Sequence, residues 1–392
     1  MTCRAGSVAL AFALLVAVAA PSATAADPVR LHVILPVTGS ASFLGREQQT
    51  AIRLIEKLVN ETGGIGGRPV AFAVHDDESK PQTSVQLVTE ILAEHPAAVL
   101  GPSVNPSCGA VAPLLEQGPI DFCFSPVIRP APGSYVFASG VIATDIESTI
   151  IRYFRLKGWT RLAFVIGTDA TGQEAERGFD EALALPENKD VHFVERIRFT
   201  PGDISVAAQM ERVKSADPQA IIVWTTGTPL ATVFKGLIQA GLDRPVAASY
   251  GNMTYPQMDA FAGFLPKELY FPSPLWVARA GDLDLAADIV AAQRQFYGAY
   301  TAAGAAPDAA AGTVWDPVMI IVNALRQLGP DADAGRLRAH LLQLAHYAGV
   351  NGVYDFTRTP QRGLTEENVV VTRWDGKQWR VVSQLTGVPL QH

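Results

Sequence analysis

Short apolar segments alternate with longer stretches of helical periodicity along most of the chain. Residues 29–35 form an apolar run that predicts a buried strand. Apolar side chains between Ala51 and Val59 then recur at helical spacing, and Gly63 and Gly64 predict the end of that helix. The alternation continues from there, and it favours parallel strands connected by helical crossovers.

A second series of the same kind begins at residues 161–166 and runs to residues 246–249. Three long helical stretches follow, at residues 283–302, 313–328 and 335–346, and the end of the chain is rich in strands. A chain of 392 residues is long enough for two cores. The pattern therefore predicts two α/β lobes joined by several crossings, with later segments returning to each lobe.

The first residues have the pattern of an export signal. Arg4 gives a positive start, residues 8–20 are apolar, and residues 23–25 supply a small-residue cleavage site. The alternative is a membrane anchor, but this apolar run is too short to span a bilayer. We therefore predict residues 1–25 as a cleaved signal peptide and a mature protein that is exported and does not span a membrane.

Charge and motif content argue against several classes of function. The formal net charge is -7 and the sequence has no basic block that would neutralise nucleic-acid phosphates, so no nucleic-acid partner is expected. The seven histidines show no metal-binding spacing, and no nucleophile-elbow or phosphate-loop signature occurs. We interpret the acidic run at residues 76–78 as a solvated turn. The sequence thus predicts a binding protein with no catalytic residue, metal or cofactor.

Two of the three cysteines belong to the predicted mature chain. Cys3 lies in the predicted signal peptide, whereas Cys108 falls at a predicted helix start and Cys123 on the strand after it. A pair of cysteines in an exported protein is compatible with a disulfide, but spacing alone does not fix the distance between their Cα atoms. Two interpretations stay open: a disulfide bond, or two buried small apolar side chains.

One feature occurs in both halves of the chain. Residues 103–107 and residues 225–229 each follow a predicted strand, and in each loop a capping residue, Asn105 or Thr228, precedes a proline suited to the first helical position. Free N–H groups and the positive end of a helix dipole would collect there and bind an anion. A single capped helix is common, but two at matching places favour a ligand site. The candidate carboxylate ligands in the first lobe are Ser103, Asn105 and Ser107.

Other candidates lie in loops next to these segments. Arg129 follows the next strand, and its guanidinium could bind a carboxylate through two hydrogen bonds, although a solvated surface arginine is an equally good interpretation. Loop aromatics can line a ligand cleft. Four aromatic residues are candidates on this ground: Phe43, Tyr250, Tyr255 and Trp276. In contrast, Trp224 looks like a packing residue.

Several short segments, taken in order, resemble one known family. They are residues 35–39 (LPVTG), 63–69 (GGIGGRP), 76–78 (DDE) with Pro81, 101–103 (GPS), 168–172 (TDATG) and 352–356 (GVYDF). The mature chain is similar to the leucine/isoleucine/valine-binding type of periplasmic receptors, the type I solute-binding proteins. The resemblance implies two Rossmann-like lobes, a ligand cleft between them, and three hinge crossings near residues 139–143, 271–274 and 352–354.

This resemblance also implies lobe boundaries and partners. The first lobe would comprise residues 26–140 and 273–351, and the second lobe residues 141–272 and 352–392. A receptor of this kind is a periplasmic monomer that delivers its ligand to an inner-membrane ABC permease and its ATPase. The cleft closes because the ligand contacts both lobes only in the closed form.

The resemblance to amino-acid-binding members does not extend to the residues that bind the ammonium group of the ligand. Those members hold the carboxylate on the loop that matches residues 105–107, and the ammonium partly on an acid in the loop that matches residues 249–253, where this chain has none. Their aromatic residue in the loop at 168–172 is replaced by Thr171. A buried ammonium without a counter-charge is costly.

The segments at 227–229 and 250–252 look more like relatives that bind aromatic carboxylates. We therefore predict a small organic acid ligand, with aromatic or keto acids favoured and with Phe43, Tyr250 and Tyr255 packing a ring. The alternatives are a branched-chain amino acid receptor, a sensing module for a membrane receptor, and a secreted α/β enzyme. The complete set of candidate ligand-binding residues is Phe43, Leu44, Ser103, Asn105, Ser107, Val127, Arg129, Asp169, Thr171, Thr226, Gly227, Thr228, Tyr250 and Asn252.

Overall fold

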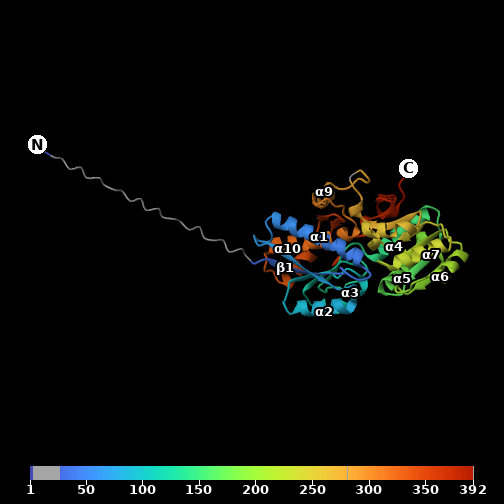
Figure 1. Ribbon diagram of the computed structural model, residues 1–392, viewed down its shortest axis with the longest axis horizontal. Helices are drawn as coiled ribbons and strands as arrows, with labels where there is room; N and C mark the ends of the chain where they lie inside the picture. The colour runs from blue at the N-terminus through green and yellow to red at the C-terminus, as the bar shows by residue number, and fades with distance from the viewer. Residues whose placement is uncertain (3–26, 280, 392) are drawn as a thin grey trace.

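Two β-sheets, each covered by helices, form the two ends of the molecule. The computed structural model describes residues 1–2, 27–279 and 281–391, so the predicted signal peptide lies, apart from its first two residues, outside the described residues. Figure 1 shows α1, α2, α3 and α10 at one end and α4, α5, α6 and α7 at the other. The prediction of two α/β lobes is therefore confirmed.

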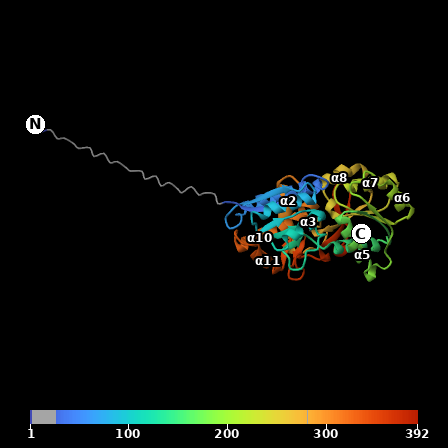
Figure 2. The same ribbon diagram turned by 90° about the horizontal axis from the view of Figure 1, so that it is seen from below.

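The first sheet is entirely parallel, with the strand order β2-β1-β3-β4-β5. Its central strands are buried on both faces, which is typical of a parallel sheet covered by helices. Apolar side chains of β1 pack alternately toward α1 and toward α2 and α3, which lie side by side (Figure 2). The bounds are β1 (Val29–Leu35), β2 (Val70–Asp76), β3 (Ala98–Leu100), β4 (Ile120–Cys123), β5 (Val136–Ala138), α1 (Ser42–Glu61), α2 (Pro81–Leu92) and α3 (Asn105–Leu115).

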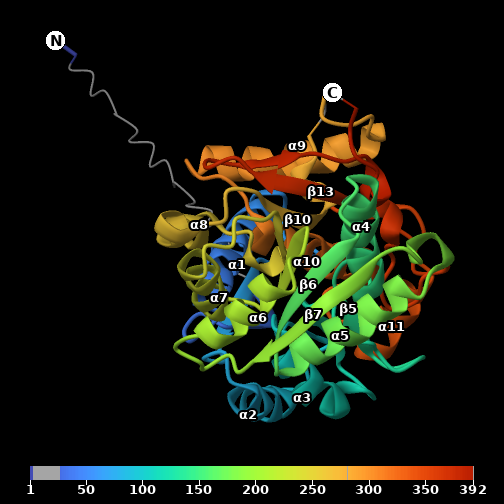
Figure 3. The same cartoon turned by 90° about the vertical axis from the view of Figure 1, so that its right-hand side faces the viewer.

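The second sheet is mixed, with the strand order β14-β13-β10-β9-β8-β6-β7. Strands β6 to β10 run parallel, whereas β13 and β14 add two antiparallel strands at one edge. Helices α5 and α6 lie over β6 and β7 (Figure 3). The bounds are β6 (Arg161–Gly167), β7 (His192–Phe199), β8 (Ala220–Trp224), β9 (Val246–Ala248), β10 (Leu269–Pro274), β13 (Val369–Trp374), β14 (Trp379–Val381), α4 (Ala143–Leu156), α5 (Ala170–Leu183), α6 (Ala207–Ser215), α7 (Pro229–Gln239) and α8 (Tyr255–Phe261).

The predicted long helices are present with shifted ends. They are α9 (Ala287–Ala302), α10 (Ala309–Leu328) and α11 (Ala334–Leu342), and a hairpin of β11 (Tyr347–Gly349) and β12 (Gly352–Tyr354) follows them. Helix α10 begins four residues before the predicted start because the Asp308 carboxylate accepts a hydrogen bond from the N–H of Ala311 and caps the helix. None of the helices in the described ranges is long and apolar enough to cross a bilayer.

Two of the three predicted crossings lie further along the chain than expected. Residues 139–143 do connect β5 of the first sheet to α4, which packs on the second sheet. Residues 271–274, however, are the last part of β10 and pair with β13. Residues 352–354 form β12, which pairs with β11, and the chain rejoins the second sheet only at Val369. The periodicity could not show this, because a crossing segment and a short buried strand have similar composition.

Cys108 and Cys123 form a disulfide, which settles the alternatives left open by the sequence. Their Cα atoms lie 6.0 Å apart, and the bond connects the first turn of α3 to the end of β4. Both side chains are fully buried. The bond therefore holds the start of α3 against the sheet edge from which the ligand-site loops project.

The disulfide predicts a specific loss of stability on its removal. It spans a sequence separation of 15 residues, and closing a loop of that size contributes about 3 kcal/mol in the chain-entropy model. We expect Cys108→Ala/Cys123→Ala to lower the free energy of unfolding by about this amount in guanidinium titrations. Reduced wild-type protein is the control for side-chain volume, and unchanged unfolding midpoints in both proteins would contradict the prediction.

Candidate functional site

A cavity of about 60 Å³ lies where the loops after the parallel strands of both sheets converge. The first sheet contributes the loops that follow β3 and β4, and the second sheet those that follow β8 and β9. Helices α1, α3, α4, α5 and α10 complete the walls. Open α/β sheets bind their ligands at the carboxyl ends of their strands, and this cavity occupies that position in both lobes at once.

Half of the predicted ligand-binding residues line this cavity: Leu44, Ser103, Asn105, Val127, Thr171, Thr226 and Tyr250. Residues that the sequence did not single out complete the lining: Gln48, Val104, Phe124, Ser125, Pro126, Ala143, Ile146, Ser249, Gly251 and Thr313. Trp224 also lines the cavity, although it packs edge-to-face on Phe179 at 5.0 Å between ring centroids. Our interpretation of Trp224 as a packing residue was therefore incomplete.

The first lobe presents unpaired amide groups at the start of α3. The helix begins at Asn105, with Val104 in the capping position, so Asn105 is the first helical residue and not the cap that we predicted. No described residue accepts a hydrogen bond from the backbone N–H of Asn105 or of Ser107. These N–H groups, at the positive end of an 11-residue helix, are available to an anion.

The hydroxyl of Ser107 contacts groups behind the helix and does not line the cavity. Its Oγ lies 2.9 Å from the Ser84 hydroxyl, which also lies 2.8 Å from the buried Asp77 carboxylate. Asp77 belongs to the acidic run that we interpreted as a solvated turn. Its side chain is fully buried, so that interpretation was wrong for this residue.

Gln48 fixes the polar wall of the cavity. The Ser103 hydroxyl donates to the Gln48 Oε1 at 2.6 Å, and the Gln48 Nε2 donates to the Thr313 Oγ1 at 3.1 Å. These two hydrogen bonds join α1, the loop after β3 and α10, which are distant in sequence. Helical periodicity marks Gln48 as a position on α1, but it does not show that a buried amide holds Ser103 in place.

The start of α7 in the second lobe differs from our prediction. Thr228 makes no side-chain capping bond, and its N–H donates to the Ser40 carbonyl of the first lobe at 3.2 Å. Gly227 has φ +84°, and a Cβ at this position would lie 2.2 Å from the same carbonyl oxygen. This end of α7 therefore closes against the first lobe and does not offer the Thr228 N–H to a ligand.

Asn252 organises the second-lobe loops without lining the cavity. Its Oδ1 accepts from the Gly227 N–H at 2.8 Å, and its Nδ2 donates to the Thr225 carbonyl at 2.8 Å. These bonds tie the loop after β9 to the loop after β8. Asp169 has a comparable local role, since its carboxylate caps α5 by accepting from the Gly172 N–H at 3.0 Å.

Tyr250 presents the free polar group of the second lobe. It lines the cavity, is only 6% exposed, and its hydroxyl makes no hydrogen bond to a described residue. Burial raises the pKa of this phenol, which therefore stays protonated and able to donate. The other predicted ring contacts lie elsewhere: Phe43 packs edge-to-face on Phe261, and Tyr255 packs on Trp379 at 4.6 Å.

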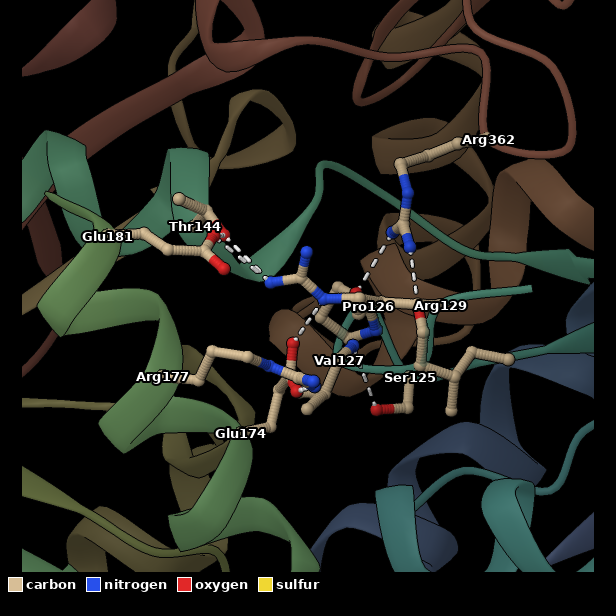
Figure 4. Close-up of polar contacts among 10 residues, drawn as sticks. Ser125, Pro126, Val127, Arg129, Thr144, Glu174, Arg177, Glu181 and Arg362 are labelled. Atoms are coloured by element: carbon tan, nitrogen blue, oxygen red, sulfur yellow. Dashed lines mark hydrogen bonds and ion pairs between the residues drawn. The ribbon is translucent and has the colours of Figure 1, made fainter. Parts of the chain in front are cut away.

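Arg129 forms an ion pair between the lobes and does not line the cavity. Its Nε donates to Glu174 at 2.8 Å, and its Nη2 lies 3.3 Å from Glu181 (Figure 4). Arg129 follows β4 of the first sheet, whereas both glutamates belong to α5, which packs on the second. A hydrogen bond from the Thr144 hydroxyl, supported by Arg129, holds the pKa of Glu181 below its usual value. The Arg129 guanidinium is thus already paired with two carboxylates.

The cavity carries no formal charge on its own lining. None of the described residues that line it is Asp, Glu, Lys, Arg or His. Within the described part of the chain, no group of three or more His, Cys, Asp or Glu side chains could hold a metal ion. The groups that this lining offers are N–H groups, hydroxyls, amides and apolar side chains.

These features are those of a two-lobed α/β protein with a small cavity between its lobes. The sequence matches the periplasmic binding protein family over residues 28–378, and the chain belongs to that family. It is 25% identical over 238 residues to a Leu/Ile/Val-binding protein homolog 6 from Brucella abortus, which covers 59% of this chain and 58% of that protein. The chain thus spans less than two thirds of the length of this relative.

Solved structures share the fold at low sequence identity. The substrate-binding protein LivJ of a branched-chain amino acid transporter from Streptococcus pneumoniae, in complex with isoleucine, has a TM-score of 0.75 at 17% identity and covers 91% of this chain and 99% of that one. A fatty acid ABC transporter substrate-binding protein from Thermomonospora curvata has a TM-score of 0.76 at 20% identity, with 91% and 92% covered. These likenesses confirm the type I periplasmic binding fold.

The close approach of Gly227 to Ser40 predicts that Gly227→Ala opens the lobes. Its control is Gly241→Ala, at a position with φ +67° where a new Cβ would meet nothing within 4 Å. Both variants should lose about 1–2 kcal/mol of stability from the left-handed backbone. Only Gly227→Ala should increase the radius of gyration in small-angle X-ray scattering. Equal radii in both variants and wild type would show that this contact does not hold the lobes together.

Proposed function

We propose that this protein is the periplasmic receptor of an ABC importer and captures a small organic carboxylate, with aromatic or keto acids favoured. The observation that carries the proposal is the cavity itself. The unpaired N–H group of Asn105 lies at one wall, Tyr250 lies at another, and none of the described residues that line the cavity is acidic. An anion would gain hydrogen bonds in this cavity without a need for a positively charged side chain in contact with it.

The lack of an acidic residue among the described residues of the lining supports a ligand without an ammonium group. An α-amino acid carries an ammonium group, which needs acceptors or a counter-charge when it is buried. Burying that group here would be costly, whereas a keto or aromatic acid has no such group. The fatty acid specificity named for the Thermomonospora curvata protein shows that this fold is compatible with a carboxylate that lacks an ammonium.

The aromatic part of the proposed ligand would pack on the rings that line the cavity. Phe124, Trp224 and Tyr250 line the cavity, together with the apolar side chains of Leu44 and Ile146. The ring contacts that we predicted for Phe43 and Tyr255 are not among them. A flat ring gains both burial and edge or stacking contacts in such surroundings, which favours an aromatic acid over a branched aliphatic one.

A branched-chain amino acid is the second candidate ligand. It is favoured by the name of the Brucella relative and by the isoleucine bound in the Streptococcus pneumoniae structure. Under either ligand, the partners that we propose are an inner-membrane permease and its ATPase. The protein would act as a monomer in the periplasm, where the predicted signal peptide would deliver it, and would bind without chemical conversion.

A thermal-shift screen separates the ligand classes. Benzoate and phenylpyruvate should raise the Tm, because a ligand that binds only the folded protein stabilises it by mass action. L-leucine and L-valine represent the second candidate, and L-phenylalanine tests whether an ammonium is tolerated beside a ring. A Tm increase with leucine or valine, and none with the aromatic acids, would replace our first candidate by the second.

Removal of the Tyr250 hydroxyl should weaken carboxylate binding. A hydrogen bond to a charged group contributes about 1.5–3 kcal/mol, so Tyr250→Phe should raise the Kd for the bound acid roughly 10- to 100-fold in calorimetric titrations. Tyr255→Phe is the matched control, because Tyr255 packs on Trp379 and does not line the cavity. The proposed role of Tyr250 fails if the two variants bind equally well.

A further inference from the structure

A second arginine lies close to the cavity and was not singled out from the sequence. Arg362 follows β12, is 5% exposed, and points its guanidinium at the loop that follows β4 (Figure 4). It donates to the carbonyls of Pro126 at 2.9 Å, of Ile128 at 2.6 Å and of Gly140 at 3.3 Å. Carbonyl groups alone therefore satisfy this guanidinium.

Arg362 makes no ion pair with any described residue, in contrast to Arg129, which belongs to the loop that Arg362 contacts. Burial lowers the pKa of Arg362 to about 10, so the side chain stays charged at neutral pH. The nearby charged groups that act on it are Asp145, which favours the charged form, and Arg129, which opposes it and has the smaller effect. Asp145 makes no ion pair with Arg362, so it offsets the positive charge of the buried guanidinium only in part.

A single residue, Pro126, separates the Arg362 guanidinium from the cavity. Pro126, whose carbonyl it binds, lines the cavity, and so does Tyr250, whose hydroxyl lies within the electrostatic influence of Arg362. The low dielectric of a closed, water-poor cavity strengthens such an interaction. A negative charge inside the cavity is thus favoured, and a positive one is disfavoured, without direct contact.

A hydrogen-bonded chain connects this charge to the cavity. The peptide group between Pro126 and Val127 presents its carbonyl to Arg362, and its N–H donates to the Ser125 Oγ at 3.3 Å (Figure 4). Ser125 lines the cavity, and its hydroxyl donates to no described residue. Its hydrogen is therefore free to point into the cavity. Hydrogen bonds arranged in such a series polarise one another, which strengthens the last donor.

We infer that Arg362 selects for a net negative ligand, acting through the Pro126–Val127 peptide and the Ser125 hydroxyl, and that it discriminates against both neutral and zwitterionic molecules. The inference rests on the proposed capture of a carboxylate and adds the residue that sets the charge of the ligand. Arg362 is a positioning residue, since it does not itself line the cavity. Arg129 cannot have this role, because Glu174 and Glu181 neutralise it.

The test compares Arg362→Lys, which keeps the charge, with Arg362→Gln, which keeps a hydrogen-bond donor but not the charge. Benzoate and phenylpyruvate are the anionic probes and benzamide is the neutral one, each measured by calorimetry or by competition. We expect Arg362→Gln to lose about tenfold in affinity for the anions, as one unit charge acting at an effective dielectric constant near 20 would give. Benzamide binding should change by less than about threefold, and Arg362→Lys should bind the anions nearly as well as wild type.

Equal losses for benzoate and benzamide in Arg362→Gln, or equal losses in both variants, would overturn the charge role and leave the proposed function intact. If no carboxylate binds wild-type protein, the proposed function itself fails. Ser125→Ala keeps the test valid where an Arg362 variant does not fold. It should weaken the anionic probes more than benzamide, and an equal effect on both would overturn the inference.

Discussion

The carboxyl ends of the parallel strands in both sheets face the same gap, and the rest of the structure depends on that constraint. The loops after β3 and β4 oppose those after β8 and β9, so N–H groups and hydroxyls of both lobes meet around one small cavity. Contact between the lobes is made by backbone at Gly227 and Ser40 on one side and by the Arg129 ion pairs on the other. A ligand between these contacts is enclosed by both lobes at once, which is the basis of capture by closure.

The sequence predicts the architecture well because local patterns determine it. Strand and helix periodicity recovers the alternating order, and the prolines at 106 and 229 locate the starts of α3 and α7 to within a residue. The roles of Asn105 and Thr228 could not be predicted in the same way. A capping signal is local, whereas the groups that contact a helix start are distant in sequence, such as the Ser40 carbonyl that accepts from the Thr228 N–H.

The ion pairing of the two arginines, Arg129 and Arg362, could not be predicted from the sequence for the same reason. Arg129 stands next to a predicted site, but its partners Glu174 and Glu181 are 45 and 52 residues away, and only the fold brings them together. Arg362 is 236 residues from Pro126, in a segment that we expected to follow the last crossing. Whether an arginine is neutralised or left with a net charge depends on burial and pairing, neither of which is visible in a single sequence. The sequence therefore identified the loop after β4, but it could not show how either guanidinium is paired.

Under the proposed function, closure of the lobes and recognition of the ligand's charge would be one event. In an open form, water would fill the gap, and its high dielectric would screen the charge of Arg362 from a ligand. The cavity between the lobes measures about 60 Å³ and no charged side chain of a described residue lines it. The effect of the buried guanidinium on a ligand would therefore be strongest in a closed form. A ligand shifts the equilibrium only by its differential affinity for the two forms. On our proposal, an anion would gain most from closing, and a zwitterion or a neutral molecule of the same shape would gain less, so the geometry that encloses the ligand would also select its charge.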